Sequence, residues 1–215
     1  LAVGAVVGAL NGALIAWVKI PPFIATLGTQ ILFAGVSRTV SGLKSVPITN
    51  TTFNFVFGGG DFGGVPVLLL WMVVVVGQLF LRKRPFGRQV ISVGGNPKAA
   101  LYSGVRVKLT IFKVMLLSGV LASLAGILWA GRFGGGRYSL GEAEETSAIA
   151  ATVLGGTSIN GGKASVAGAC VGAVMLGMIN NALVMYGLDV YQQMVVRGLI
   201  ILAAVAFTVN AEKDA

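Results

Sequence analysis

The sequence predicts an all-α, polytopic transmembrane helix bundle, and three observations support this. Of its 215 residues, 55% are hydrophobic and 11% are charged, whereas soluble domains carry roughly a quarter charged residues. Several apolar stretches approach or exceed the ~20 residues that a helix needs to cross a bilayer. The loop 82–108 separates two of these stretches and has seven Lys or Arg but no Asp or Glu. Short basic loops resist translocation, so this loop is expected in the cytoplasm.

Seven crossings are expected once the basic loop is fixed on the inner side. The segment 147–159 is short, but it has to cross if successive loops alternate between the two sides. This alternation places Leu1 outside and the C-terminus inside. The segment 43–65 is polar and Gly-rich, so it is expected to be an irregular loop. The chain begins within an apolar run and without Met, so we expect an N-terminally truncated fragment. The expected spans are 1–18, 23–42, 66–81, 109–131, 147–159, 164–187 and 193–209.

Small residues recur at four-residue spacing in three of the spans. Such stripes let helix backbones approach closely in a membrane. We therefore expect a tightly packed bundle in which these stripes form the contacts. The stripes are Gly4, Gly8 and Gly12; Ser118, Ala122, Gly126 and Ala130; and Ser165, Ala169, Ala173 and Gly177.

A short helix is predicted at 96–104, inside the basic loop. Asn96 is a favourable N-cap, Pro97 suits the first helical position, and Gly104 suits the position after the end. The exposed face would carry small side chains, which leave room for a partner. We favour partner docking over a simple surface turn. The residues concerned are Gly94, Gly95, Asn96, Pro97, Ala99, Ala100, Ser103 and Gly104.

Two groups of polar residues near the spans have alternative interpretations. Asn180 and Asn181 lie in an apolar span, where amides either bond to a neighbouring helix or line a wet pathway. Glu142, Glu144 and Glu145 form an acidic outer loop, which is either simply solvated or a docking contact for a soluble partner. Catalysis by these carboxylates is the weakest alternative.

Cofactor and catalytic chemistry have little support. The chain has no His and one cysteine, Cys170, so common proton shuttles and metal sites are excluded. The G-x-G-x-x-G spacing that starts at Gly58 lacks a surrounding βαβ unit. The run 156–165 resembles a P-loop, but its Lys163 comes one residue too late. We therefore expect no cofactor, metal or nucleotide site. The net charge of +9 does not favour nucleic-acid binding, because much of the excess lies in one loop.

Five sequence blocks resemble the permease subunit of ribose/galactose-type bacterial ABC sugar importers, a family related to branched-chain amino-acid permeases. The resemblance implies a fold similar to that of vitamin B12 importers. It also implies that residues 1–215 form a single permease domain, the C-terminal two-thirds of the full subunit, with 82–108 as its coupling loop. The blocks are PPFIATLGT (21–29), GRQVISVGGNPKAALYSGV (87–105), LSGVLASLAGIL (117–128), AIAATVLGGTSINGGKASVAG (148–168) and INNAL (179–183).

The resemblance also implies partners and a location. A second permease subunit, identical or paralogous, would complete the path for a ribose-, xylose- or galactose-like monosaccharide across the bacterial inner membrane. Cytoplasmic ATPase subunits would grip the helix at 96–104 and hydrolyse ATP. An extracytoplasmic sugar-binding protein would dock near Glu142, Glu144 and Glu145. The subunit itself would have no catalytic residue. Candidate path residues are Phe23, Thr26, Gly155, Gly156, Asn180 and Asn181.

One departure and several alternatives accompany this interpretation. The family usually has an acidic residue where this chain has Ser147, so a role carried by that acid is in doubt. A permease for branched-chain amino acids or another small solute is the nearest alternative. An ion-coupled secondary transporter is less favoured, because no Asp or Glu lies in the middle of a clear span. A membrane enzyme is disfavoured by the missing His.

Overall fold

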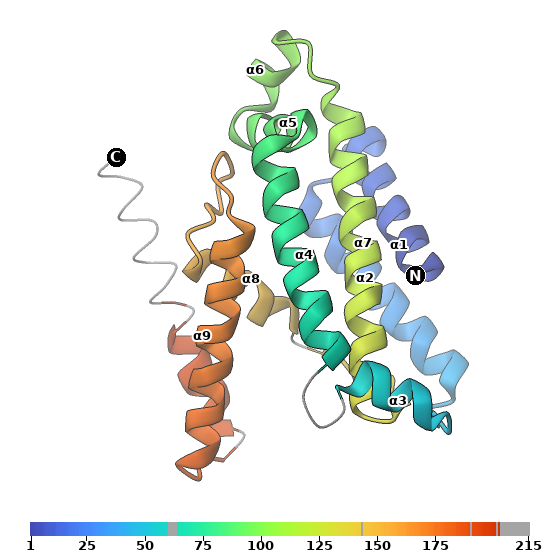
Figure 1. Ribbon diagram of the computed structural model, residues 1–215. Helices are drawn as coiled ribbons and strands as arrows, with labels where there is room; N and C mark the ends of the chain where they lie inside the picture. Colours follow the sequence, from blue (N-terminus) through green and yellow to red (C-terminus); the bar gives the residue numbers. More distant parts are fainter. Residues whose placement is uncertain (60–63, 143, 190, 201, 203–215) are drawn as a thin grey trace. The chain divides into compact units, whose positions relative to one another are not determined.

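The computed structural model describes residues 1–59, 64–142, 144–189, 191–200 and 202, most of which are helical (Figure 1). This confirms the predicted all-α class. The chain divides into two compact units, Leu1–Val73 with Lys98–Gly141, and Val74–Pro97 with Glu142–Ala215. Within the described ranges, four helices are long and apolar enough to cross a membrane. They are α2 (Pro22–Ser41), α4 (Gly64–Lys83), α7 (Val107–Arg132) and α9 (Val166–Met185).

The first unit is built on α1 (Ala2–Ala13), which continues as the π-helical segment η1 (Leu14–Val18). The predicted spans 1–18, 23–42 and 109–131 thus correspond to α1 with η1, to α2 and to α7. Gly42 ends α2 in the left-handed conformation (φ 56°), which a residue without Cβ adopts readily.

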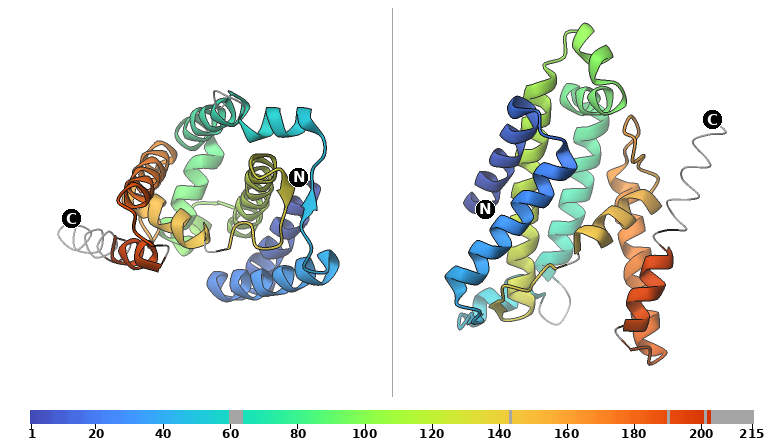
Figure 2. Two further views of the ribbon diagram at one scale, coloured as in Figure 1. Left: turned by 90° about the horizontal axis from the view of Figure 1, so that it is seen from below. Right: turned by 180° about the vertical axis from the view of Figure 1, so that it is seen from behind.

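Helix α1 lies alongside α7, as Figures 1 and 2 show. The predicted stripe of α1 forms this contact: Gly4, Gly8 and Gly12 are its buried residues. A Cβ at Gly8 would lie 2.5 Å from the carbonyl oxygen of Met115, so no larger residue fits without movement. The stripe predicted for α7 is wrong, however. The contacts lie one position further along, at Gly119 and Ser123, and Gly126 has nothing within 4 Å.

The segment between α2 and α4 is more ordered than predicted. It contains the two-residue strand β1 (Val46–Pro47) and the helix α3 (Thr51–Gly58). Strand β1 pairs antiparallel with β2 (Gly135–Gly136). The side chain of Asn50 accepts a hydrogen bond from the backbone N–H of Phe53 at 3.1 Å and so caps α3. The expectation of an irregular loop is wrong here, because this cap and the packing of α3 against α7 stabilise the segment.

The second unit contains the second half of α4, α5 (Pro85–Gly95), α8 (Glu144–Leu154), α9 and a helical stretch at 191–200. Helix α8 packs against α9 by direct backbone approach. A Cβ at Gly172 would overlap the carbonyl oxygen of Ala151, and Gly155 and Gly168 exclude a Cβ from each other. The contacting face of α9 is therefore Gly168 and Gly172, and not the stripe predicted from Ser165 to Gly177. The apolar core of this contact consists of Ala150, Ala151 and Leu176.

Helix α8 is too short to be a full span. It has 11 residues, which correspond to about 16 Å of helix against ~30 Å of hydrocarbon. The predicted crossing at 147–159 is wrong as a helical span, because the helix ends at Leu154. A run of turns follows, with φ of 81° at Gly156, 88° at Gly161 and 80° at Gly162. The predicted last span is helical over 191–200, and most of its remainder lies outside the described residues.

Candidate functional site

The basic loop contains two helices, α5 and α6 (Pro97–Tyr102). Sequence reasoning predicted the short helix at 96–104 but missed α5. The available signal was Pro85 at the first helical position followed by Phe86, Val90 and Val93 at helical spacing. Asn96, predicted as an N-cap, directly precedes Pro97, the first residue of α6, and it is also the C-cap of α5, with φ −153° and ψ 99°.

The end of α6 is a Schellman motif, as the prediction for Gly104 requires. The N–H of Val105 bonds to the carbonyl of Ala100, and the N–H of Gly104 to that of Leu101, both at 3.0 Å. Gly104 has φ 82°. This pair of bonds satisfies the last carbonyls of the helix and turns the chain sharply into α7.

The exposed face of α6 differs from the prediction. Ala100 was expected on the outer face, but it is 1% exposed and belongs to the interior. Ala99 and Ser103 are exposed as expected. Leu101 and Tyr102, which sequence reasoning did not select, are 60% and 88% exposed. Large apolar side chains at the surface of a polar loop are typical of an interaction site.

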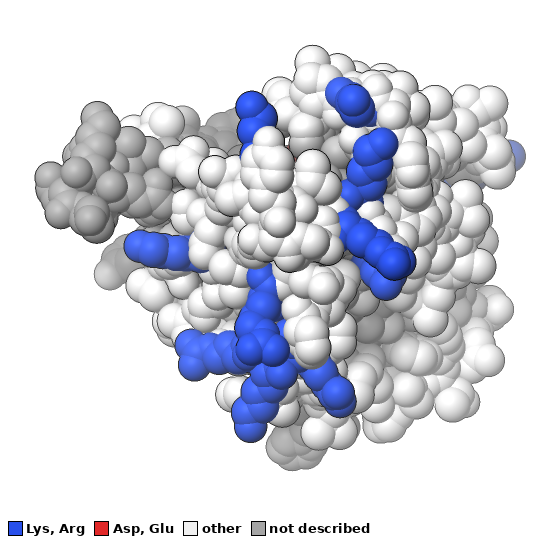
Figure 3. Space-filling view, turned by 90° about the horizontal axis from the view of Figure 1, so that it is seen from above, with Lys and Arg blue, Asp and Glu red and all other residues white. Residues whose placement is uncertain are grey.

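The charge of this region has one sign. In Figure 3, the view onto the loop helices, Lys and Arg side chains are visible and no Asp or Glu is seen among the described residues in view. Arg82 and Lys83 lie in the last turn of α4, where positively charged side chains interact favourably with the helix dipole. The basic loop thus contains two helices, its charged residues are all Lys or Arg, and α6 exposes Leu101 and Tyr102.

Within the second unit, the turn between α8 and α9 contacts the end of α5. A Cβ at Gly161 would overlap the carbonyl oxygen of Gly94, and a Cβ at Gly162 would lie 3.3 Å from the Cα of Gly95. Glycines on both sides therefore allow two backbones to touch. Through this contact, Gly94 and Gly95 at the end of α5 pack against the turn that connects α8 to α9.

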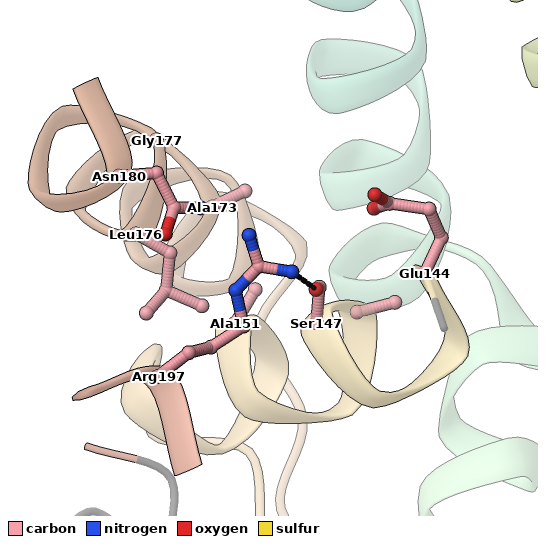
Figure 4. A pocket seen from close by; sticks show the side chains of 9 residues that line it. Glu144, Ser147, Ala151, Ala173, Leu176, Gly177, Asn180 and Arg197 are labelled. Carbon is pink, nitrogen blue, oxygen red and sulfur yellow. Dashed lines mark hydrogen bonds between the residues drawn. The ribbon is translucent and has the colours of Figure 1, made fainter. Parts of the chain in front are cut away.

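A pocket of about 320 Å³ lies in the second unit between α8, α9 and the helical stretch 191–200 (Figure 4). Arg197 donates a hydrogen bond from Nη1 to the Oγ of Ser147 at 3.3 Å. The Nε of Arg197 is buried and has no hydrogen-bond partner among the residues that the structure describes. The lining residues are Glu144, Ser147, Ala148, Ala151, Ala173, Leu176, Gly177, Asn180 and Arg197.

The predicted path residues are distributed over both units. Asn180 lines the pocket, whereas Asn181 is exposed and is not among its lining residues. Gly155 packs against Gly168, and Gly156 faces open space. In the first unit, Phe23 is 72% exposed on α2, and the hydroxyl of Thr26 bonds to carbonyls of its own helix.

The acidic residues are not all in a loop. Glu144 and Glu145 form the first turn of α8, and Glu144 lines the pocket. Glu142 precedes the helix and is exposed. The residues that sequence reasoning missed are Ser147 and Arg197 as partners. Their separation of 50 residues left no local signal for this pairing.

With this geometry established, comparison with known proteins identifies the class. The chain matches the family model described as the permease component of the branched-chain amino acid transport system over residues 1–205. It belongs to this family of transport permeases, and with its apolar helices it is a multi-pass membrane protein.

Curated relatives are permeases of sugar transporters. The chain is 40% identical to the D-allose transport system permease protein of Escherichia coli over 95% of this chain and 63% of that protein. It is 40% identical to the ribose import permease protein of Bacillus subtilis over 91% of this chain and 62% of that protein. It is 37% identical to the galactose/methyl galactoside import permease protein of Escherichia coli over 95% and 63%. The chain thus spans slightly less than two thirds of the length of these relatives. No solved structure matches the sequence significantly.

Proposed function

We propose that this chain is part of the membrane-spanning subunit of an ATP-driven importer that carries a monosaccharide across the inner membrane. The observation that carries the proposal is the 36–40% identity, over most of the chain, to permeases named for allose, ribose, galactose and arabinose. ATP hydrolysis takes place on separate ATPase subunits. A second permease subunit completes the path, and an extracytoplasmic binding protein delivers the sugar. Uptake of labelled pentoses and hexoses by a deletion strain, with and without the restored gene, tests the proposal.

Helix α6 is the proposed contact with the ATPase. Its support is the cationic loop, the sharp Schellman end and the exposed Leu101 and Tyr102. ATP binding moves the ATPases, and α6 moves with them. Because α5 leads directly into α6 and touches the α8–α9 turn at Gly94 and Gly161, a shift of the loop also reaches the α8–α9 pair. The loop accordingly lies in the cytoplasm, as does the C-terminus.

Two matched substitutions test this docking. Ala99→Trp adds bulk to an exposed position, so the assembled transporter should hydrolyse ATP without transport while its melting temperature stays the same. Ala100→Trp forces bulk into a position that is 1% exposed, so it should lower the melting temperature by several degrees, since overpacking costs about 1–3 kcal/mol. If ATP hydrolysis stayed coupled to transport in the Ala99→Trp variant, the proposed contact between α6 and the ATPase would be contradicted.

The proposed path for the sugar follows the polar residues of the spans. Asn180 lines a pocket beside the half-length helix α8, and discontinuous helices frequently form substrate sites in transporters. Glu142, Glu144 and Glu145 remain candidates for contact with the binding protein. Replacing Glu142 and Glu145 by Gln, and keeping Glu144 because it also lines the pocket, should weaken the affinity of the binding protein for the transporter, measured by surface plasmon resonance at low salt.

A permease for branched-chain amino acids is the second candidate, because the matching family model carries that description. The same uptake assay distinguishes the two. Labelled leucine, isoleucine and valine are offered beside the sugars, and accumulation of an amino acid without any sugar would establish the second candidate.

A further inference from the structure

The polar pocket of the second unit has hydrogen-bonding groups that the protein itself leaves unused. The Nε of Arg197 is buried and has no hydrogen-bond partner within the described part of the chain. The half-buried amide of Asn180 and the exposed carboxylate of Glu144 line the same pocket. Figure 4 shows side chains from three helical segments around this space, with the guanidinium of Arg197 between Asn180 and Ser147. Donors and acceptors left unpaired together are costly unless a ligand or water meets them.

The depth of the pocket makes these unpaired groups more costly. Asn180 lies about 21 Å along α9 from Val166, in a helix long and apolar enough to cross the membrane. Helix α8 reaches the same level from the opposite direction, because Ala151 packs on Gly172 and Ser147 lies one turn before Ala151. Polar groups at membrane depth are rare and mark substrate pathways. The pocket therefore has the position of a path site.

The lining offers a ligand both hydrogen-bond donors and hydrogen-bond acceptors: the guanidinium of Arg197, the carboxylate of Glu144 and the amide of Asn180. A ligand with several hydroxyl groups can bond to all three at once, because each hydroxyl both donates and accepts. Hydroxyl groups can accept from the guanidinium, donate to the carboxylate, and do both with the amide of Asn180. The small side chains of Ala151 and Ala173 leave room for a ring, and the volume of about 320 Å³ is that of a small-molecule site.

We propose that this pocket is a transient binding site for the hydroxyl groups of a sugar during translocation, with Asn180 as a specificity-determining residue. The inference rests on the proposed function and adds a defined site to it. The permease then contributes to sugar specificity itself, after the binding protein has released the sugar. Arg197 and Glu144 supply the charged donor and acceptor, and Ser147 orients Arg197 through the 3.3 Å hydrogen bond.

The test compares Asn180→Leu with the control Met178→Leu in the full-length permease, assembled with its ATPase and binding protein in proteoliposomes. Both variants place a Leu side chain in the same helix, but only Asn180 lines the pocket, whereas Met178 is 61% exposed. Uptake is measured at saturating binding protein for the transported sugar and for each of its monodeoxy analogues. Thermal unfolding of both variants shows whether the fold is kept.

We expect Asn180→Leu to lower the uptake rate of the sugar about five- to tenfold, the cost of one hydrogen bond at a desolvated site. Met178→Leu should stay within about twofold of wild type. For the analogue that lacks the hydroxyl bound by Asn180, Asn180→Leu should cause no further loss. Equal effects of the two variants, or a uniform loss on every analogue, would overturn the inference while leaving sugar import intact. A wild-type transporter that takes up no sugar would overturn the proposed function instead.

Discussion

The side chain of Gln78, in α4, caps the N-terminus of α9. Its Oε1 accepts hydrogen bonds from the backbone N–H groups of Val166 at 2.9 Å and Ala167 at 3.2 Å. Ser165 caps the same helix by accepting from the N–H of Gly168 at 3.0 Å. Two side chains thus satisfy three of the first N–H groups of α9, which have no partner within the helix. This arrangement ties α4 to α9 across 88 residues of sequence.

Gln78→Leu removes this cap and leaves two N–H groups unpaired. We expect a loss of about 1–3 kcal/mol in the free energy of unfolding, or a decrease of roughly 3–10 °C in melting temperature for a chain of this size. Gln78→Glu keeps an acceptor at the same place and should melt near wild type. Thermal unfolding in detergent measures both, and equal melting of the Leu variant and wild type would show that the cap carries no stability.

The contact between α1 and α7 gives a second prediction, based on one substitution at two positions. Gly8→Leu places a side chain where Met115 and Leu116 already lie within 3.1 Å of a Cβ, whereas Gly126→Leu meets nothing within 4 Å. Overpacking costs about 1–3 kcal/mol, so Gly8→Leu should lower the melting temperature and Gly126→Leu should leave it nearly unchanged. Similar melting of the two variants would contradict this packing of α1 on α7.

The sequence predicted the long helices well, because an apolar run of the right length has few alternatives. It also predicted the stripe at Gly4 and Gly8, since the three glycines of α1 all lie on one face. Helix α7 has small residues on adjacent faces, at Ser118 and Gly119 among others, so periodicity could not select the face that contacts α1. Only the positions of both helices determine that choice.

The candidate site was less predictable for similar reasons. Asn180 was found because an amide in an apolar span is conspicuous. Its companions Ser147 and Arg197 come from other segments, and no local spacing connects them. Ala100 was misplaced because its small size suggested an open surface, but small residues equally suit a tight interior. The capping role of Gln78 depends on a contact far away in sequence, which no single-segment rule captures.

A third prediction concerns the turn between α8 and α9. Gly161 and Gly156 both have positive φ, 88° and 81°, so Ala causes backbone strain of about 1–2 kcal/mol at either position. Only at Gly161 would the new Cβ also overlap a neighbour, the carbonyl oxygen of Gly94, while Gly156 has open space. Gly161→Ala should therefore melt several degrees below Gly156→Ala. If the proposed coupling is right, it should also reduce transport per ATP hydrolysed. Identical behaviour of the two variants would exclude a role for the contact with α5.

The last prediction concerns the side of the membrane on which α6 lies. Helix α9 has the length of one span, so we expect Tyr186, which follows its last residue, to face the compartment opposite to the turn at Gly161. That turn touches the end of α5 at Gly94, and α6 begins three residues later, at Pro97. Tyr102 and Tyr186, which are 88% and 86% exposed, should therefore face opposite compartments.

Cysteine labelling checks this arrangement directly. In a Cys170→Ser background, Tyr102→Cys and Tyr186→Cys are treated with an impermeant maleimide, first in intact cells and then after permeabilisation. Because short basic loops resist translocation, we expect only Tyr186→Cys to react in intact cells, and both variants to react once the membrane is opened. Labelling of Tyr102→Cys from outside would reverse the orientation, and it would separate α6 from any cytoplasmic ATPase.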